Sequence, residues 1–542
     1  MPSVPLLERY PWQAAALAVL VLLAYANSLG SSFHFDDYAI LVDGYITGPG
    51  FGWELFRPAQ TRPLTYLTFH WNYLAGAQDA EGYHWVNLIL HGANCLLLLS
   101  LARKYLSPLV AGCVTALFAL HPLQTEAVTY VFARSTLLST HFALWTLWFY
   151  ARERWIPSAL MFGVSLLAKE ETVALPGFLL LWELFERRRP DGRRLGYFAL
   201  LAGFAALAAG RLFYLIKTAP FDPGVGRVRG ISTASYLLTQ GRVLWTYLRL
   251  LIAPYGLNLD RDMPVSTSLG SPWTTLPAWI ALIALGAALL WLAWKKHAAA
   301  IWALGYFVLI SPSSSIVAQA DLIFEHRTYL SMVCLVIALG FVLERVPRAR
   351  LTITFALLIP LMLAGTIARN ADWHDEKTFW TDVTAKSPHK ARAWLGLARA
   401  YMNEDPAKTR EYLKKGLEVD PENAELHTNY GVALMGAQQP GEALAHFQKA
   451  LALTHETADH WNNIGAAYFS LNQFDRSMSS YQRALSVDPC NYNARRNLVM
   501  LLADHSSPQA AFQAGEVPVN CHLIPDQAAE LEKYRQQVLH SK

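Results

Sequence analysis

The chain has 542 residues, of which 53% are hydrophobic and only 16% are charged. It is more apolar and less charged than an ordinary soluble globular protein, so we expect most of it to lie in lipid. The formal net charge of +4 is small and Lys and Arg cluster in short loops, which excludes a binding stripe for nucleic acid.

About eleven apolar segments predict an all-α, polytopic membrane helical bundle. The first covers residues 12–29 and lacks a small-residue cleavage site, so we interpret it as a retained span rather than a signal peptide. The others lie near residues 86–102, 108–120, 136–150, 155–168, 173–186, 195–216, 276–294, 298–311, 329–344 and 351–368. Several are shorter than the roughly 20 residues that a perpendicular helix needs, so we expect their polar ends to extend the helices.

Positive charge indicates which loops are cytoplasmic, because Lys and Arg in short loops are retained on that side. These residues fall in every second loop: Arg103, Lys104, Arg152, Arg154, Arg187, Arg188, Arg189, Arg193, Arg194, Lys295, Lys296, Arg345, Arg348 and Arg350. The alternation predicts a cytoplasmic N-terminus, with the loop after the first span and the C-terminal region outside. It requires residues 232–253 to form an interfacial helix on the outer face rather than a span.

Two adjacent carboxylates, Asp36 and Asp37, follow the first apolar segment. Like charges at a membrane boundary lose hydration and repel each other, so one of them becomes a stronger base than a free aspartate. We interpret this pair as the candidate catalytic residues, with Asp36 as the base and Asp37 nearly equivalent. The alternative is that both side chains simply face water in a loop after a helix.

Further polar side chains lie in the outer loops, at the ends of several apolar segments. They are Arg62, His121, Glu126, Arg134, Lys169, Glu170, His326, Arg327 and Tyr329. Arg, Lys and His can hold a phosphate or diphosphate leaving group and stabilise the charge that develops on it. Each residue alone is more typical of a snorkelling or capping side chain, but together they indicate a site for a charged lipid headgroup.

Four polar residues share one stripe of the second apolar segment. His84, Asn87, His91 and Asn94 recur at spacings of three and four residues, which places them on one helical face. We expect them to form interhelical hydrogen bonds, and a metal or proton-relay role is the alternative.

From about residue 371 the chain becomes polar and Ala-rich, and an internal repeat begins. Similar residues recur every 34 positions in three sets: Leu413, Phe447 and Tyr481; Gly416, Ala450 and Ala484; Leu397, Gly431 and Gly465. This period, with small residues at close helix approaches and aromatic residues between helices, is typical of a tetratricopeptide-repeat α-solenoid. Phe379 lies one period before Leu413 and predicts a half-repeat joined to the last span.

The predicted organisation is a membrane domain at residues 1–370, a repeat domain at 371–505 and a C-terminal tail at 506–542. None of the five cysteines has metal-ligand spacing. Cys490 and Cys521 both lie in the polar region and would form a disulfide if that region faces an oxidising compartment. No motif for nucleotide binding is present, so soluble nucleotide chemistry is not expected.

The order of these motifs resembles the transmembrane and tetratricopeptide-repeat O-mannosyltransferases over nearly the whole chain. The shared motifs are Asp36-Asp37, Arg62-Pro63-Leu64, His121-Pro122-Leu123-Gln124-Thr125-Glu126-Ala127, the loop of Arg134, Lys169-Glu170 and the late cluster of Glu325, Arg327 and Tyr329, followed by the repeats. The resemblance implies a membrane glycosyltransferase of the C superfamily, which transfers sugar with inversion from a polyprenyl-phosphate donor to a hydroxyl on the far side of the membrane.

Carried over to this chain, the resemblance implies that Asp36 and Asp37 are the acidic motif. It implies that Arg62, His121, Glu126 and Arg134 line the site, that Lys169 and Glu170 are a polar pair, and that Arg327 and Tyr329 form the late cluster. The chain departs from the family at residues 133–136, which read Ala-Arg-Ser-Thr where the family usually has Gly-Arg-Ala-Asp, and it has only about three full repeats. Its compact form resembles bacterial members, which implies an inner membrane location and periplasmic repeats.

The expected function is transfer of a single sugar to a Ser or Thr hydroxyl of an exported protein, with one aspartate as base. The expected partners are the lipid-linked donor, membrane lipids and a protein acceptor on the concave face of the repeats. No metal is required, although some relatives in the superfamily use a divalent cation. The alternatives are a transferase of preassembled oligosaccharide, a glycolipid-modifying enzyme, and a non-enzymatic scaffold that presents the repeats.

Overall fold

The computed structural model describes residues 11–48, 62–186, 191–218, 230–315, 317–505, 508–519, 521, 523 and 525–540. Arg187, Arg188 and Arg189 of the predicted cytoplasmic loops lie outside these ranges. The chain divides into two compact units, Met1–Lys386 and Ser387–Lys542, so the division falls later than the predicted boundary at residue 370. Every named element among the described residues is a helix, which confirms the all-α prediction.

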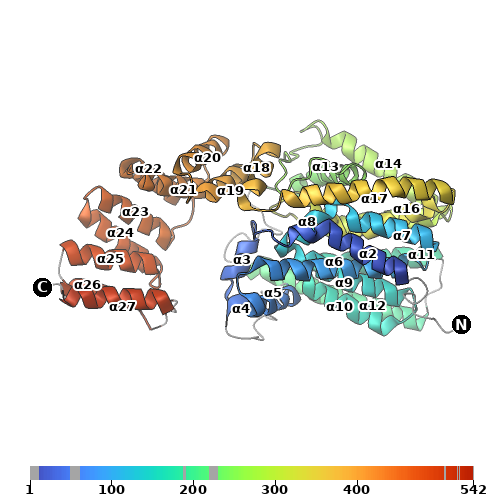
Figure 1. Ribbon diagram of the computed structural model, residues 1–542, viewed down its shortest axis with the longest axis horizontal. Coiled ribbons are helices and arrows are strands. Elements are labelled where there is room, and N and C mark those ends of the chain that lie inside the picture. The colour runs from blue at the N-terminus through green and yellow to red at the C-terminus, as the bar shows by residue number, and fades with distance from the viewer. Residues whose placement is uncertain are drawn as a thin grey trace. The chain divides into compact units, whose positions relative to one another are not determined.

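Each apolar segment of the first unit forms a helix. These helices are α2 (Pro11–Tyr25), α6 (Ala80–Ala102), α7 (Pro108–Leu120), α9 (Arg134–Tyr150), α10 (Trp155–Ala168), α11 (Leu175–Glu186), α12 (Gly192–Thr218), α14 (Thr275–Trp294), α15 (Ala298–Ile310), α16 (Tyr329–Leu343) and α17 (Arg348–Ala371). Within this unit α7 packs against α6, α16 and α17 (Figure 1). Their apolar faces bury one continuous core, in which van der Waals packing holds the helices together.

Fewer of these helices meet the length of a membrane span. Among the described residues, six helices are long and apolar enough to cross a membrane, or seven if the bent pair Pro108–Leu120 and Pro122–Thr129 is one span. The predicted count of about eleven is therefore not confirmed. The apolar helices Trp155–Ala168 and Ala298–Ser313 are too short to cross at right angles.

The remaining elements of the first unit lie between these helices or follow the last of them. They are α3 (Asp37–Val42), α4 (Gly44–Thr47), α5 (Pro63–Gly76), α8 (Thr125–Thr129), α13 (Thr233–Ile252), α18 (Glu376–Lys386) and the 3₁₀ turns η1 (Ala26–Ser28), η3 (Pro122–Gln124), η4 (Val131–Ala133), η5 (Glu170–Ala174), η6 (Ser311–Ser313) and η7 (Glu325–Thr328). The helix expected at residues 232–253 is α13, and its position at the interface stays a prediction.

The polar stripe of α6 forms interhelical hydrogen bonds, as predicted. His84 Nε2 lies 3.0 Å from the Ser31 carbonyl, and Asn87 Nδ2 donates to the Val128 carbonyl at 3.2 Å. The other two stripe residues are also bonded: His91 to Tyr329 and Ala119, and Asn94 to Leu137 and Tyr329. All four side chains are buried, so the stripe holds α6 against its neighbours.

Phe379 does not open a half-repeat, because α18 belongs to the first unit. Its ring stacks on His34, with 4.8 Å between the ring centroids, and it contacts Trp373 at the same centroid distance. The aromatic side chain therefore supports the loop that carries the acid pair, and the structure corrects the prediction at this position.

The second unit consists of paired helices. The pairs are α19 (Ala391–Tyr401) with α20 (Pro406–Val419), α21 (Ala424–Gly436) with α22 (Pro440–Leu453), and α23 (Ala458–Ser470) with α24 (Phe474–Val487). Gly431 faces the ring of Phe447, and Gly465 faces the ring of Tyr481 one period later. A Cβ atom at Gly465 would lie 2.6 Å from that ring, so only glycine permits this approach of the helices.

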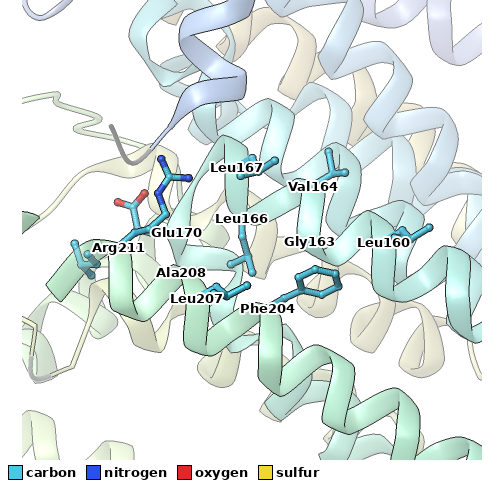
Figure 2. Close-up of a pocket in the computed structure, with 11 residues that line it drawn as sticks. Leu160, Gly163, Val164, Leu166, Leu167, Glu170, Phe204, Leu207, Ala208 and Arg211 are labelled. Atoms are coloured by element: carbon cyan, nitrogen blue, oxygen red, sulfur yellow. The ribbon is translucent and has the colours of Figure 1, made fainter. Parts of the chain in front are cut away.

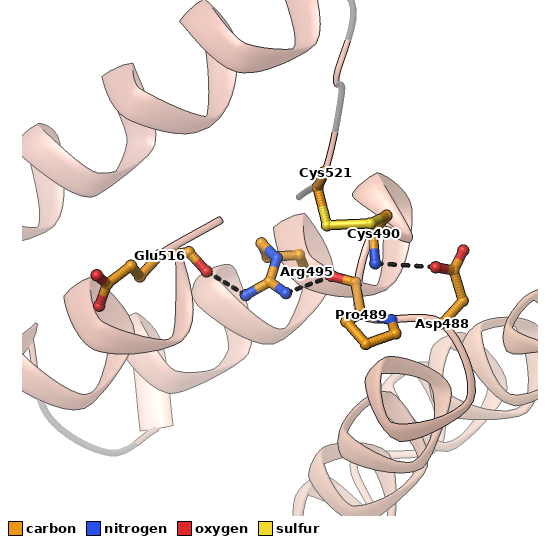
Figure 3. The surroundings of a disulfide bond; sticks show 6 residues. All are labelled: Asp488, Pro489, Cys490, Arg495, Glu516 and Cys521. Carbon is orange, nitrogen blue, oxygen red and sulfur yellow. Dashed lines mark hydrogen bonds between the residues drawn. A yellow bond between two sulfur atoms is a disulfide. The ribbon is translucent and has the colours of Figure 1, made fainter. Parts of the chain in front are cut away.

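The predicted tail continues the second unit. Helix α25 (Tyr492–His505) packs against α26 (Pro508–Ala514) and α27 (Pro525–His540). Cys490 and Cys521 form the predicted disulfide, and the Arg495 guanidinium donates to the carbonyls of Pro489 and Glu516 beside it (Figure 3). These bonds fix the segment after α26 to the start of α25.

We predict that Gly465→Ala destabilises the α23–α24 pair by about 1–3 kcal/mol, because the added methyl group overpacks the contact with Tyr481. Native-state hydrogen exchange of α23 and α24 peptides in the full chain measures this loss. Gly436→Ala is the matched control, because a Cβ atom there meets nothing within 4 Å. Equal protection in the two variants would contradict the packing argument.

Candidate functional site

A polar pocket of about 320 Å³ lies at one end of the first unit. Its wall includes the loop that carries Asp36 and Asp37, which we name the acid loop. The rest of the wall comes from the start of α5, from η4 with the start of α9, from η5, and from the segment between residue 319 and η7. The lining residues are Asp36, Arg62, Tyr130, Phe132, Ala133, Ser135, Lys169, Glu170, Glu171, Gln319, Ala320, Asp321, Phe324, His326 and Arg327. Six of the predicted site residues therefore meet in one cavity: Asp36, Arg62, Lys169, Glu170, His326 and Arg327.

The two adjacent aspartates have different environments. Asp37 is fully buried, and its carboxylate accepts the backbone N–H of His34 at 3.0 Å and that of Phe132 at 2.7 Å. Asp36 is exposed and lines the pocket, and its own backbone N–H donates to the Tyr130 hydroxyl at 3.3 Å. Asp37 thus fixes the loop, whereas Asp36 presents its carboxylate to the cavity.

The acid loop is anchored from its other side by His34. The buried ring has Nε2 at 2.7 Å from the Trp373 carbonyl and Nδ1 at 3.2 Å from Glu376 Oε1. Phe35, which follows, has a positive φ of 51°, a conformation that a residue with a side chain seldom adopts. The surrounding contacts with α18 hold the backbone in this turn, which brings Asp36 to the pocket.

Two ion pairs set the charge of the pocket on the side of η5. Arg62 donates to both carboxylate oxygens of Glu170, at 3.1 Å from Nε and 2.7 Å from Nη2. Burial opposes ionisation of Glu170, but the Arg62 cation outweighs it and lowers the pKa of Glu170 to about 2. Lys169 is buried, donates to Thr136 Oγ1 at 3.0 Å and lies 2.8 Å from a Glu171 carboxylate oxygen. Both cations are therefore held at the pocket wall by neighbouring carboxylates.

Glu126 fixes the orientation of His326. Its carboxylate lies 2.6 Å from His326 Nδ1 and accepts the backbone N–H groups of Glu325 and His326 at 3.2 and 3.3 Å. Because Nδ1 is engaged in this way, Nε2 is the ring nitrogen that can contact a ligand in the pocket. Glu126 is therefore a positioning residue behind the pocket rather than part of its lining.

Arg327 has a donor that the described residues do not satisfy. Its Nη2 donates to the Asp321 carbonyl at 2.9 Å, while its buried Nη1 has no hydrogen-bond partner among the described residues. The side chain is only 7% exposed, and it lines the pocket. An unsatisfied guanidinium nitrogen in such a wall is suited to an anionic ligand.

Two other predicted residues lie outside the pocket lining and are bonded to other parts of the first unit. His121 uses both ring nitrogens, toward the Leu251 carbonyl and the Leu123 N–H. The Tyr329 hydroxyl is bonded to His91 within the core. Neither side chain lines the pocket, so both stabilise the fold around it.

Arg134, predicted to bind phosphate, is also a structural residue. Its guanidinium donates to Asn87 Oδ1 at 2.8 Å, Asn72 Oδ1 at 2.6 Å and the Tyr83 carbonyl at 3.0 Å. It is fully buried and stacks over the Phe69 ring. This arrangement joins α5, α6 and α9 and leaves the following residue, Ser135, to line the pocket.

Some pocket residues had no role in the sequence prediction. Tyr130 and Asp321 belong to no charged or repeated pattern, and no sequence signal identifies them. Glu171 follows the predicted residue Glu170, and Ser135 follows Arg134. Their position next to predicted site residues was the only sequence signal that could have identified them. Among the described residues, no group of three or more His, Cys, Asp or Glu side chains could hold a metal ion.

The second unit matches the tetratricopeptide repeat family at residues 458–489. The chain is 25% identical over 498 residues to the protein O-mannosyl-transferase TMTC3 of Mus musculus, covering 80% of this chain and 54% of the relative. It is 25% identical over 532 residues to Tmtc3 of Drosophila melanogaster, covering 79% and 57%. These relatives confirm the resemblance that the motifs predicted.

The chain spans little more than half the length of these two relatives. Among solved structures, MamA is 22% identical with a TM-score of 0.24, covering 29% of this chain and 87% of MamA. The tetratricopeptide-repeat protein YrrB is 20% identical with a TM-score of 0.25, covering 35% and 90%.

We predict that Asp37 makes the acid loop sensitive to pH. Burial raises the pKa of Asp37 from 3.8 to about 7, so the folded loop holds the proton more tightly than the unfolded chain does. This stabilisation is complete below pH 3.8 and is lost as the pH rises through about 7. Hydrogen exchange of the loop peptide, corrected for its intrinsic pH dependence, measures the loss.

The control for this experiment is the neighbouring acid. Asp36→Asn should keep the pH dependence, shifted slightly to lower pH because the variant removes a like charge beside Asp37. Asp37→Asn should abolish the pH dependence, because the amide does not titrate. The new amide nitrogen would face one of the two backbone N–H donors, so that hydrogen bond would be lost. An unchanged pH dependence in Asp37→Asn would show that another group is responsible.

Proposed function

We propose that this chain is an inverting glycosyltransferase. It moves a single sugar from a polyprenyl-phosphate donor to a Ser or Thr hydroxyl of an exported protein on the outer face of the membrane. The observation that carries the proposal is the pocket in which the exposed carboxylate of Asp36 shares one cavity with Arg62, Lys169, His326 and Arg327. The relatives named protein O-mannosyl-transferases support the same chemistry.

Asp36 is the general base of the proposed reaction. A Ser or Thr hydroxyl has a pKa far above neutrality, so its proton must pass to a carboxylate as the new bond forms. Asp36 is exposed and lines the pocket beside Tyr130. Asp37 is buried behind it, where both of its carboxylate oxygens accept backbone N–H groups. Asp37 therefore positions the loop, and Asp36 accepts the proton.

The cations stabilise the leaving group. The acceptor oxygen attacks the anomeric carbon, the bond from that carbon to the phosphate oxygen breaks, and the lipid phosphate leaves with the electron pair. Arg62, Lys169 and Arg327 offset its growing negative charge. Attack from the face opposite the phosphate inverts the configuration of the sugar.

Arg327 lines the pocket, and its buried Nη1 has no hydrogen-bond partner among the described residues, so the guanidinium can turn toward the phosphate without losing a hydrogen bond from that nitrogen. Arg62 and Lys169 are already paired with Glu170 and Glu171, so they bind the phosphate only by sharing their donors. This difference places the phosphate nearest Arg327 in the proposal. No step requires a metal ion, and addition of a chelator should leave the transfer rate unchanged.

The second unit supplies the acceptor site in this proposal. Stacked helix pairs present a concave face that usually holds an extended peptide or a helix. We place the acid loop and the repeats on the periplasmic side of a bacterial inner membrane, with the N-terminus in the cytoplasm. The disulfide between Cys490 and Cys521 supports an oxidising compartment for the repeats.

We predict that Asp36→Asn lowers the transfer rate by roughly 10²–10⁴-fold, the usual contribution of a general base, without loss of the folded protein. The assay uses the purified full chain, a polyprenyl-phosphate-linked mannose as donor, and intact-mass analysis of an exported-protein fraction as acceptor. Asp43→Asn is the matched control, because Asp43 lies in the same segment and does not line the pocket. Full transfer by Asp36→Asn would refute the mechanism.

A further inference from the structure

An apolar groove of about 450 Å³ lies between α10 and α12 of the first unit. Leu160 and Gly163 on α10 face Phe204 and Leu207 on α12 across it (Figure 2). The groove follows about two turns of each helix, which corresponds to roughly 10–12 Å along the axes. A channel of this length accommodates part of one extended hydrocarbon chain.

Only one end of the groove carries charged side chains. Glu170 and Arg211 lie together at that end, and Leu160 lies at the opposite end (Figure 2). Glu170 also lines the polar pocket, where it receives the two hydrogen bonds of Arg62. The apolar groove and the polar pocket therefore meet at one residue.

The groove is open toward the surface of the first unit. Leu207 is 69% exposed and Leu160 is 50% exposed, although both are large apolar side chains. Helix α12 is among the helices long and apolar enough to cross a membrane, so these side chains would meet lipid. The close approach of Phe204 depends on Gly163, where a Cβ atom would lie 3.2 Å from the ring.

We propose that this groove binds the isoprenoid tail of the lipid-linked donor while the phosphate occupies the polar pocket. The inference rests on the proposed function. A donor with an apolar tail and an anionic head needs an apolar channel that ends beside cations, and the groove ends beside Arg211 and Arg62. Lateral opening lets the remainder of a long tail stay in the bilayer, so the donor enters without leaving lipid.

The test compares two donors that share the sugar and phosphate and differ in the tail, a methyl phosphate, which has no tail to enter the groove, and a long polyprenyl phosphate. Gly163→Phe and Leu207→Trp fill the groove. Each should lower the ratio of long-tail to short-tail transfer rates by about tenfold, because loss of contact with about two methylene groups already has this effect. Gly203→Phe and Leu200→Trp, exposed positions of α12 outside the groove, should keep the ratio of the unaltered chain.

An unchanged ratio in both groove variants, with transfer intact, would overturn the groove assignment and leave the proposed function standing. It would mean that ordinary bilayer lipid occupies the groove. An equal loss of transfer with both donors would also overturn it, because the change would then act on the headgroup site. Absence of transfer by the unaltered chain with either donor would remove the proposed function and this inference with it.

Discussion

Charged side chains at the ends of apolar helices are the constraint on which the first unit depends. Removing an ion from water has an effective penalty of several kcal/mol, so such groups persist only where partners compensate them. Arg62 is held by Glu170, Lys169 by Glu171, and Glu126 by backbone N–H groups and His326. These pairings connect loops that are far apart in the sequence and give the pocket its shape.

The acid loop also shows how burial is compensated by hydrogen bonds. Its two adjacent aspartates lie in different environments. Asp37 is buried and bonded to two backbone N–H groups, whereas Asp36, one residue earlier, remains exposed at the pocket. His34 fixes the loop to α18 through Trp373 and Glu376. The orientation of the proposed base therefore depends on a helix more than 300 residues later in the chain.

Sequence reasoning predicted the helices and most of the charged pocket, because apolar runs and charges at their ends are local signals. It could not separate Arg134 from Arg327, since both are arginines in segments predicted to be outer loops. Only the fold shows that the Arg134 guanidinium donates to Asn72, Asn87 and Tyr83. It also shows that Nη1 of Arg327 has no hydrogen-bond partner among the described residues. The predicted count of about eleven spans is not confirmed, because apolar composition locates a helix but does not determine whether the helix is long enough to cross.

In the proposed mechanism, one pocket binds the donor phosphate beside Asp36. Photo-crosslinking tests it directly, with a polyprenyl-phosphate sugar analogue that carries a diazirine on the sugar and peptide mapping by mass spectrometry. We expect labels on peptides that contain residues 33–42, 130–136, 169–175 and 319–328, and we expect the unmodified donor to compete with this labelling. Labels confined to peptides outside the pocket, with none on these segments, would contradict it.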